Sequence, residues 1–204
     1  DQPRSRGLGD VYKRQGSGKT SLIKLLLREY DVDKGAIYLN DHDIRDYRLT
    51  DLRGLMGYVP QDQFLFATSI LDNIRFGNPN LPLSAVEEAT KLAQVYKDIV
   101  DMPQGFDTLI GEKGVSLSGG QKQRLAMSRA MILDPDILIL DDSLSAVDAK
   151  TEYAIIDNLK ETRKNKTTII TAHRLSAVVH ADLILVLQNG QIIERGTHED
   201  LLAL

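Results

Sequence analysis

A glycine-rich run that leads directly into an apolar helix constrains the fold of this chain more than any other feature. Gly16-Ser17-Gly18-Lys19-Thr20 is followed by residues 21–29, in which leucine and isoleucine recur. Glycines let the backbone approach a phosphate, the helix start supplies free N–H groups, and the lysine adds a positive charge. The run therefore predicts a phosphate-binding loop. The residues expected to contact phosphates are Gly16, Ser17, Gly18, Lys19, Thr20 and Ser21, and the Thr20 hydroxyl is also expected to bind Mg²⁺.

The composition of the chain excludes several classes of protein. Its 204 residues suffice for one domain, and its net charge of −4 argues against nucleic acid as a partner, because nucleic acid needs a basic face. The absence of cysteine excludes disulfides and thiolate metal sites. No apolar run approaches the roughly 18 residues of a membrane-spanning helix. We therefore expect a globular domain with no nucleic-acid partner.

Short apolar runs alternate with helical patterns, which is typical of an α/β domain with a mainly parallel sheet. Asn189-Gly190 between two apolar runs predicts a two-residue hairpin turn. Thr197 with Asp200 three residues later is a capping-box pattern for a last helix at 197–204. The strands are expected at 36–39, 55–59, 137–140, 167–171, 182–187 and 191–195, and the other helices at 69–76, 84–95, 118–133 and 149–163.

The first fifteen residues do not fit this pattern. Residues 1–15 are polar and lack the alternation of a strand, although an apolar strand normally feeds a phosphate-binding loop. Lys13 stands where the full pattern of such a loop has a glycine, five residues before Gly18. We therefore interpret residues 1–15 as a non-native or disordered leader, and the domain as N-terminally truncated.

A second element of a nucleotide site follows the phosphate-binding loop by about 120 residues. Residues 137–140 are all apolar, as expected of a buried parallel strand, and Asp141 and Asp142 come directly after them. A carboxylate at the end of such a strand can hold Mg²⁺, directly or through water. Asp141 is the residue expected to do so.

Four further motifs lead to a family. Leu117-Ser118-Gly119-Gly120-Gln121, before a long helix, resembles the signature motif of ABC ATPases. Gln61 in the run Tyr-Val-Pro-Gln resembles their Q-loop glutamine, and His173 in Thr-Ala-His-Arg resembles their switch histidine. Residues 145–148, Ser-Ala-Val-Asp, resemble their D-loop. The order and spacing of the motifs match over residues 16–204.

The resemblance implies a division of the domain and a subfamily. Residues 16–61 and 135–204 are expected to form a RecA-like core, and residues 62–134 a helical subdomain that carries the signature motif. The run Gly-Glu-Lys-Gly at 111–114 resembles the element with which exporters touch their membrane helices. Residues 62–74 are similar to the sequence that follows the Q-loop in exporters.

The resemblance also implies a mechanism that needs two ABC ATPase domains. ATP with Mg²⁺ would be held between the phosphate-binding loop of one domain and the signature motif of the other. Ser118, Gly119, Gly120 and Gln121 would then contact ATP bound to the partner. Gln61 would bind Mg²⁺ and sense the γ-phosphate, and His173 would contact the γ-phosphate. The domain would work at the cytoplasmic face of the membrane, where ATP hydrolysis would move the helices of a transmembrane domain that is missing from this chain.

Asp142 departs from the family pattern, because active sites in this family usually carry glutamate at that position. Aspartate is one methylene shorter, so its carboxylate falls back by roughly 1.5 Å. A displacement near 1 Å can lower a rate about 100-fold. We therefore expect a site that binds ATP and hydrolyses it slowly, as in the degenerate half of a bacterial heterodimeric multidrug exporter.

Three alternatives remain open at this point. The first alternative is a homodimeric exporter in which aspartate at position 142 is a tolerated variant. A soluble ABC ATPase without a membrane domain, acting on ribosomes or DNA, is a second alternative. The third is a regulatory module that binds ATP and never hydrolyses it.

Overall fold

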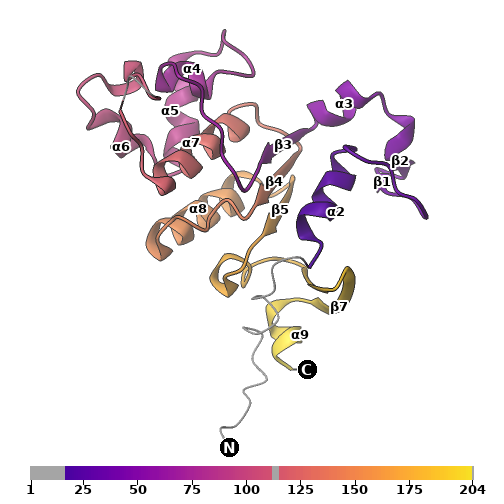
Figure 1. Ribbon diagram of the computed structural model, residues 1–204. Coiled ribbons are helices and arrows are strands. Elements are labelled where there is room, and N and C mark those ends of the chain that lie inside the picture. Colours follow the sequence, from indigo (N-terminus) through magenta and orange to yellow (C-terminus); the bar gives the residue numbers. More distant parts are fainter. Residues whose placement is uncertain (1–16, 112–114, 204) are drawn as a thin grey trace, which may run out of the picture.

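A three-stranded parallel sheet forms the centre of the molecule. The computed structural model describes residues 17–111 and 115–203. Strands β3 (Met56–Val59), β4 (Ile137–Asp141) and β5 (Thr167–Thr171) pair in the order β3-β4-β5, with both pairs parallel. All three carboxyl ends therefore lie at one edge of the sheet (Figure 1). The α/β class, the parallel core and the positions of these strands are confirmed.

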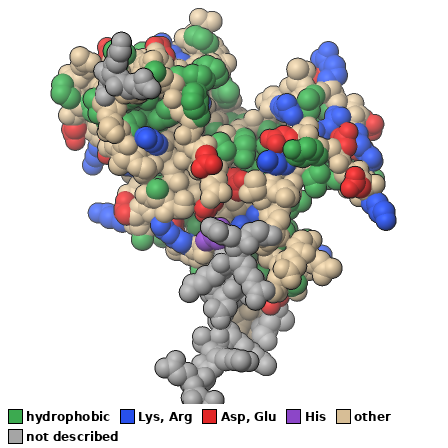
Figure 2. Space-filling model, in the orientation of Figure 1, with side chains coloured by type: hydrophobic (Ala, Val, Ile, Leu, Met, Phe, Trp, Pro, Cys, Tyr) green, Lys and Arg blue, Asp and Glu red, His purple; other side chains and the backbone are tan. Residues whose placement is uncertain are grey.

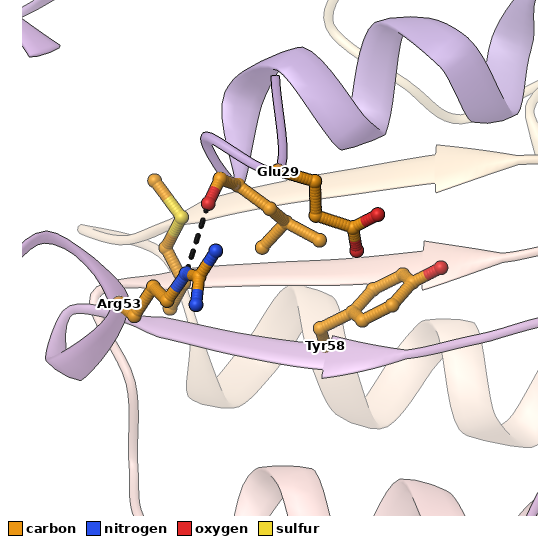
Figure 3. Close-up of a pocket in the computed structure, with 5 residues that line it drawn as sticks. Glu29, Arg53 and Tyr58 are labelled. Atoms are coloured by element: carbon orange, nitrogen blue, oxygen red, sulfur yellow. Dashed lines mark hydrogen bonds between the residues drawn. The ribbon is translucent and has the colours of Figure 1, made fainter. Parts of the chain in front are cut away.

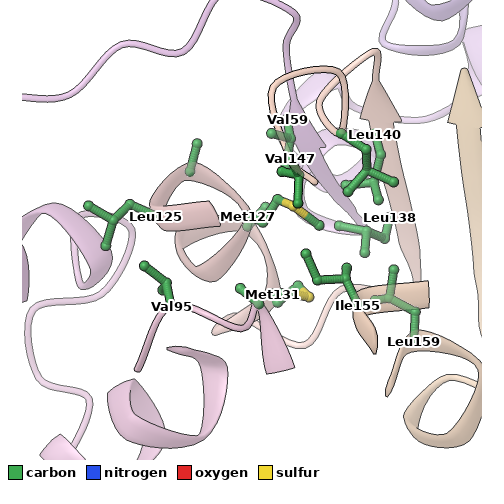
Figure 4. Close-up of a cluster of buried hydrophobic side chains, with 14 of the residues drawn as sticks. Val59, Val95, Leu125, Met127, Met131, Leu138, Leu140, Val147, Ile155 and Leu159 are labelled. Atoms are coloured by element: carbon green, nitrogen blue, oxygen red, sulfur yellow. The ribbon is translucent and has the colours of Figure 1, made fainter. Parts of the chain in front are cut away.

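The sheet is covered on both faces because alternate residues of each strand point to opposite sides. Leu138 and Leu140 of β4 pack with side chains of α7 (Gly119–Met131) and α8 (Ala149–Thr162), as Figure 4 shows. Ile139 packs instead with Ile23 and Leu27, at the end of α2 (Lys19–Leu26). Helix α2 thus lies on one face of the sheet, and α7 and α8 lie on the other.

Helices α4 to α7 gather on one side of the sheet (Figure 1). They are α4 (Ile70–Ile74), α5 (Leu83–Leu92), α6 (Tyr96–Val100) and α7, with the 3₁₀ turn η2 (Gly105–Asp107) between α6 and α7. Ser69 caps α4 by accepting a hydrogen bond from the backbone N–H of Asp72. The helices expected at 69–76, 84–95 and 118–133 are confirmed with shorter bounds, whereas α6 was not predicted. The boundaries of a core and a helical subdomain stay a prediction.

Two antiparallel ribbons flank the parallel sheet. Strands β6 (Ile184–Gln188) and β7 (Gln191–Gly196) form the predicted hairpin, and both turn residues, Asn189 and Gly190, have positive φ. Helix α9 (His198–Leu202) follows with the predicted capping box between Thr197 and Asp200. Near the other end of the described chain, β1 (Tyr38–Leu39) pairs with β2 (His42–Asp43). The expected strand at 36–39 is thus reduced to two residues.

Short elements complete the fold and were not predicted. Helix α3 (Leu49–Gly54) precedes β3, and 3₁₀ turns occur at η1 (Ile44–Asp46) and η3 (Leu175–Ala177). No helix in the described ranges is long and apolar enough to cross a membrane. The proposed leader at 1–15, Gly16 and most of the 111–114 element lie outside the described residues.

An arginine links the segment after β3 to the helices. Arg129 of α7 donates hydrogen bonds to the backbone oxygens of Phe64 (2.9 Å) and Asn73 (2.8 Å), and to Asn73 Oδ1 (2.7 Å). Its guanidinium also lies 5.5 Å from the ring centre of Phe66 and 6.0 Å from that of Phe76. Burial lowers the pKa of Arg129. The segment that follows Gln61 is therefore fixed to α7 and α4.

The surface differs between the two sides of the molecule. Figure 2 shows hydrophobic side chains gathered where α4 to α7 lie, and basic and acidic side chains interspersed around α2, α3 and the β1–β2 ribbon. Phe64 and Phe76 are 67% and 59% exposed. The helical side is therefore the more apolar of the two.

Gly57 gives a test of the sheet packing. A Cβ added at Gly57 in β3 would lie 2.7 Å from Pro135 Cγ and 3.0 Å from the carbonyl oxygen of Ala130. We predict that Gly57→Ala lowers the free energy of unfolding by about 1–3 kcal/mol, because the backbone of α7 cannot move freely. Urea unfolding would measure it.

Gly54 supplies the matched control. It ends α3, and a Cβ added there meets nothing within 4 Å. Gly54→Ala should be neutral or should raise the free energy of unfolding by about 0.4–1 kcal/mol. Equal destabilisation by the two substitutions would contradict the packing described for β3.

Candidate functional site

The start of α2 has the geometry of an anion site. Gly18 lies at the N-cap with φ of +97°, a conformation that favours glycine, and it contributes no side chain to cap the first turn. Lys19 Nζ lies 3.1 Å from Ser17 Oγ. Thr20 and Ser21 are exposed at the same helix start. The first N–H groups of α2, the ammonium and these hydroxyls are thus available together for a phosphate.

The turn of the C-terminal hairpin lies beside this loop. The backbone N–H of Gly190 donates to the carbonyl oxygen of Ser17 over 3.2 Å. A Cβ on Gly18 would lie 3.6 Å from the Gly190 Cα. The β6–β7 turn therefore holds the chain at the point where it enters α2.

Asp141 ends the central strand and is 2% exposed. Its Oδ1 accepts a hydrogen bond of 2.6 Å from Thr171 Oγ1, while its buried Oδ2 has no hydrogen-bond partner among the described residues. A buried carboxylate oxygen without a donor is unfavourable unless a cation or a proton compensates it. Asp141 therefore fits a divalent cation. Mg²⁺ commonly takes one or two protein carboxylates together with substrate phosphates.

Asp142 follows in a left-handed conformation with φ of +47°. Its backbone N–H donates to both the carbonyl oxygen and Oγ1 of Thr171, each over 3.1 Å. Burial raises the pKa of its carboxyl above the usual value of 3.8, and the positive charge of His173 opposes that rise. Asp141 adds to the rise, whereas Lys19 also opposes it. The loop lysine and the histidine therefore act on the same carboxyl.

Gln61 and His173 lie at the same edge of the sheet, because they follow β3 and β5 closely. Both are exposed. The strand register, in which Val59 lies opposite Leu140 and Asp141 lies opposite Thr171, brings the three strand ends together. Lys19, Asp141, Asp142 and His173 are thus grouped, with Gln61 beyond the end of the neighbouring strand.

The signature run begins on the other face of the sheet. Ser118 caps α7: its Oγ accepts from the backbone N–H of Gln121 (3.2 Å), and Gln121 Oε1 accepts from the N–H of Ser118 (3.0 Å). Ser118 and Gly119 are exposed. Gln121 also donates to Asp98 Oδ1 in α6 over 3.1 Å. The run therefore presents a capped, exposed helix start, apart from the phosphate-binding loop on the opposite face.

A pocket elsewhere does not contain these residues. It lies on the α2 face of the sheet and is lined by Leu27, Glu29, Arg53, Met56 and Tyr58 (Figure 3). Arg53 closes one side by donating to the carbonyl oxygen of Leu27 over 3.0 Å. Burial, with the negative charges of Asp141 and Glu29, raises the pKa of Tyr58 to about 12. None of the residues expected to bind nucleotide lines this pocket.

Comparison with known proteins identifies the family. The family model described as "ABC transporter" matches residues 14–145. The chain belongs to the ABC transporter family. Within that family it is an ATPase domain, in agreement with the resemblance of its motifs.

The relatives that this ABC domain matches are much longer proteins. It is 54% identical over 190 residues to the probable multidrug resistance ABC transporter ATP-binding/permease protein YheI of Bacillus subtilis, covering 93% of the chain and 32% of that protein. It is 46% identical to a putative multidrug export ATP-binding/permease protein of Staphylococcus aureus, covering 92% of the chain and 32% of that protein. The chain therefore spans about a third of each relative.

A solved structure shows the same fold. The chain superimposes on a bacterial Atm1-family ABC exporter with ATP bound, with a TM-score of 0.88 and 40% identity, covering 93% of this chain and 33% of that one. The described fold is therefore also found in about a third of an ABC exporter chain.

Thr171, Gln123 and Arg174 contribute to the site and were missed by the sequence analysis. Thr171 holds both Asp141 and Asp142. In the sequence, Thr171 is only a hydroxyl residue at the end of an expected strand. Its role becomes apparent once the strand register places it opposite Asp141. Gln123 and Arg174 hold the loop after Asp142, through contacts between segments far apart in the chain.

The raised pKa of Asp142 has a consequence for stability. The folded protein keeps this proton at a pH at which the unfolded chain has lost it, so stability falls as the pH rises from the usual value through the raised pKa. Asp142→Asn carries no charge to bury. We predict that it melts at a higher temperature than the wild type at pH 7, and that the difference shrinks toward about pH 4.

Asp148 serves as the control with the opposite sign. Hydrogen bonding with Thr151 at the start of α8 lowers the pKa of Asp148. Asp148→Asn should therefore lose stability relative to wild type at pH 7, with the loss shrinking as the pH falls through the usual value. Melting temperatures of the three proteins from about pH 2 to pH 8 test both trends, because the window for Asp148 lies below the usual value of 3.8. A difference for Asp142→Asn that does not vary with pH would contradict the electrostatic origin.

Proposed function

We propose that this domain binds ATP with Mg²⁺, pairs with a second ABC ATPase domain, and powers export of a substrate across a membrane. The observation that carries the proposal is the grouping of Lys19, the unpaired oxygen of Asp141, Asp142 and the His173 segment at one edge of the sheet. Exporter relatives with 46–54% identity support the transport role. The domain would lie at the cytoplasmic face, with a transmembrane domain contributed by sequence beyond the chain described.

The phosphate chain of ATP would lie along the start of α2. The free N–H groups of the first turn and the ammonium of Lys19 neutralise phosphate oxygens. Asp141 and the Thr20 hydroxyl hold Mg²⁺, and Gln61 contributes an amide oxygen from the end of β3. His173 contacts the γ-phosphate. Mg²⁺ supplies positive charge against the charge that develops on the phosphate oxygens during transfer.

A second ABC domain is needed because the signature run begins on the opposite face from the phosphate-binding loop. Ser118 with the exposed Gly119 of α7 offers another helix start to a phosphate. Such a surface would serve ATP that a partner domain holds. Binding of ATP would then close the pair, and hydrolysis would release it.

Asp142 supports an asymmetric pair. Its carboxylate falls short of the position of a glutamate by about 1.5 Å, and it has a raised pKa. We therefore propose that this domain's own site hydrolyses ATP slowly, that the partner is a different half-transporter, and that Ser118 serves the partner's faster site. A homodimer, a soluble ABC ATPase and a purely regulatory ATP-binding module are the alternatives.

The weak-site proposal predicts a gain of function. In the assembled transporter, with the partner's catalytic glutamate removed, Asp142→Glu should raise the turnover at this domain's own site by about 10- to 100-fold. The ATP concentration for half-saturation should change little, because Lys19, Thr20 and Asp141 are untouched. Phosphate release measured against ATP concentration separates the two parameters.

Lys19→Ala is the control for this measurement. It should raise the half-saturating ATP concentration by about 10-fold or more, because a charge-assisted hydrogen bond is lost. Equal turnover by the wild type and Asp142→Glu would overturn the weak-site proposal and favour a homodimer. If Lys19→Ala changed neither parameter, ATP binding at this loop would itself be refuted.

Ser118 allows the role of the signature run to be separated from helix capping. Ser118→Ala removes the cap and should cost about 1 kcal/mol of stability. Ser118→Asp keeps a good cap but adds a negative charge toward the phosphate of the partner's ATP. We predict that Ser118→Asp lowers turnover at the partner's site further than Ser118→Ala, by about 10-fold or more.

Melting temperatures provide the reference for both variants. Ser118→Asp should be the more stable of the two, since it retains the cap. If activity followed stability, with Ser118→Asp close to wild type and Ser118→Ala impaired, Ser118 would act only as a cap.

A further inference from the structure

The loop between β4 and α8 is held by side chains that come from two distant segments. Ser145 and Ala146 are exposed, whereas Val147 is 3% exposed. One holding side chain is Gln123, in the second turn of α7. The other is Arg174, directly after His173. Arg174 ends the Thr-Ala-His-Arg run, but neither Gln123 nor Arg174 is among the residues that contact nucleotide in the proposed function.

Gln123 fixes the loop to the signature helix. It is 5% exposed, and its Oε1 accepts a hydrogen bond of 2.9 Å from the backbone N–H of Ala146. Its Nε2 donates to Ser145 Oγ over 3.1 Å. A Cβ on Gly120 would lie only 2.9 Å from the carbonyl oxygen of Ala146. The first turn of α7 is therefore in direct contact with the loop, and glycine is required there.

Arg174 fixes the same loop from the other side. Its Nη1 donates to the carbonyl oxygen of Val147 over 2.8 Å, and its Nη2 donates to that of Ser145. Nη1 also lies 3.1 Å from Glu152 Oε2 in α8. The planar guanidinium thus binds two loop carbonyls and one carboxylate through two nitrogens held in one plane, a spacing that the single nitrogen of an ammonium does not reproduce.

Glu152 explains why Arg174 is fixed in this position. Its carboxylate is 2% exposed and accepts a second hydrogen bond, at Oε1, from Ser176 Oγ. A buried carboxylate needs a paired cation, because an unpaired charge in the interior is strongly unfavourable. Glu152 therefore orients the arginine that holds the loop.

The loop is also joined to the candidate catalytic carboxyl residue. Ser145 Oγ donates to the backbone carbonyl oxygen of Asp142 over 2.8 Å. A continuous set of hydrogen bonds thus runs from Asp142 and the His173 segment, through residues 145–147, to the first turns of α7. The residues of this domain's own ATP site and its signature run are connected through one short loop.

We propose that Gln123 and Arg174 are positioning residues that clamp residues 145–147, so that the state of this domain's own ATP site sets the position of its signature run. The inference rests on the proposed function, because the signature run would serve a partner's ATP. Weakening either clamp should lower turnover at the partner's site without weakening ATP binding.

The test compares Arg174→Lys and Gln123→Met with a matched control, Ser176→Ala, in the full-length transporter. Arg174→Lys keeps the charge beside Glu152 but loses the fork, and Gln123→Met keeps the length of the side chain but loses both hydrogen bonds. Ser176→Ala removes a hydrogen bond from Glu152 and leaves the loop contacts intact. ATP turnover is measured against ATP concentration, and hydrogen–deuterium exchange is followed in peptides covering residues 117–121 and 143–148.

Each loop variant should lower the maximal turnover about 10-fold, with half-saturating ATP within about twofold of wild type. The double variant should be much less impaired than the product of the two, because both act on one loop. Exchange at 143–148 should be faster in both variants, and in Arg174→Lys it should also be faster at 117–121. Ser176→Ala should match wild type in turnover.

Two results would overturn the inference. One is wild-type turnover in Arg174→Lys and Gln123→Met. The other is unchanged exchange at 117–121 in Arg174→Lys, since the loop would then not transmit the change to the signature run. Failure of the proposed function is a separate outcome, in which a folded wild-type transporter neither binds nor hydrolyses ATP. In that case, hydrogen–deuterium exchange alone decides whether Gln123 and Arg174 hold residues 145–147.

Discussion

Strand β4 is the element on which the rest of the structure depends. It is paired on both edges and covered on both faces, and residues 138–140 have no exposed surface. Its alternating side chains separate α2 from α7 and α8, so α2 and the signature helix α7 begin on opposite faces of the sheet. Because β4 is parallel to both neighbours, its carboxyl end is also where the residues of three loops meet.

The two aspartates at that end illustrate how position within a few ångströms changes the chemistry of identical side chains. Asp141 completes the strand and is buried with one oxygen bonded to Thr171 and the other unpaired. Asp142 leaves the strand with a positive φ, and its half-buried carboxyl lies among charges of both signs. The first is suited to a cation and the second to a proton, although one hydroxyl contacts both residues: Thr171 Oγ1 donates to the side chain of Asp141 and accepts from the backbone N–H of Asp142.

The sequence was sufficient where a local signal agrees with the tertiary structure. The apolar run before Asp141, the Asn189-Gly190 turn and the capping box of Thr197 each specify a conformation within a few residues, and each was predicted. Helices α3 and α6 are too short to show a helical period, and the β1–β2 ribbon has two residues in each strand. The nucleotide motifs were recognised through their order along the chain. The contacts of Thr171, Gln123 and Arg174 depend on strand register and on packing between distant segments, which no local pattern encodes.

Arg129 connects the segment after Gln61 to the signature helix through contacts with neutral groups. Its donors are used by carbonyl and amide oxygens, and its charge lies near two aromatic rings. Ion pairs such as that between Arg48 and Asp51, both largely exposed, weaken as mobile ions screen them. Contacts of a partly buried guanidinium with neutral dipoles are screened much less. The mechanical link between the two motifs therefore keeps its strength across a wide range of ionic strengths, even where the surface ion pairs of the same domain have been lost.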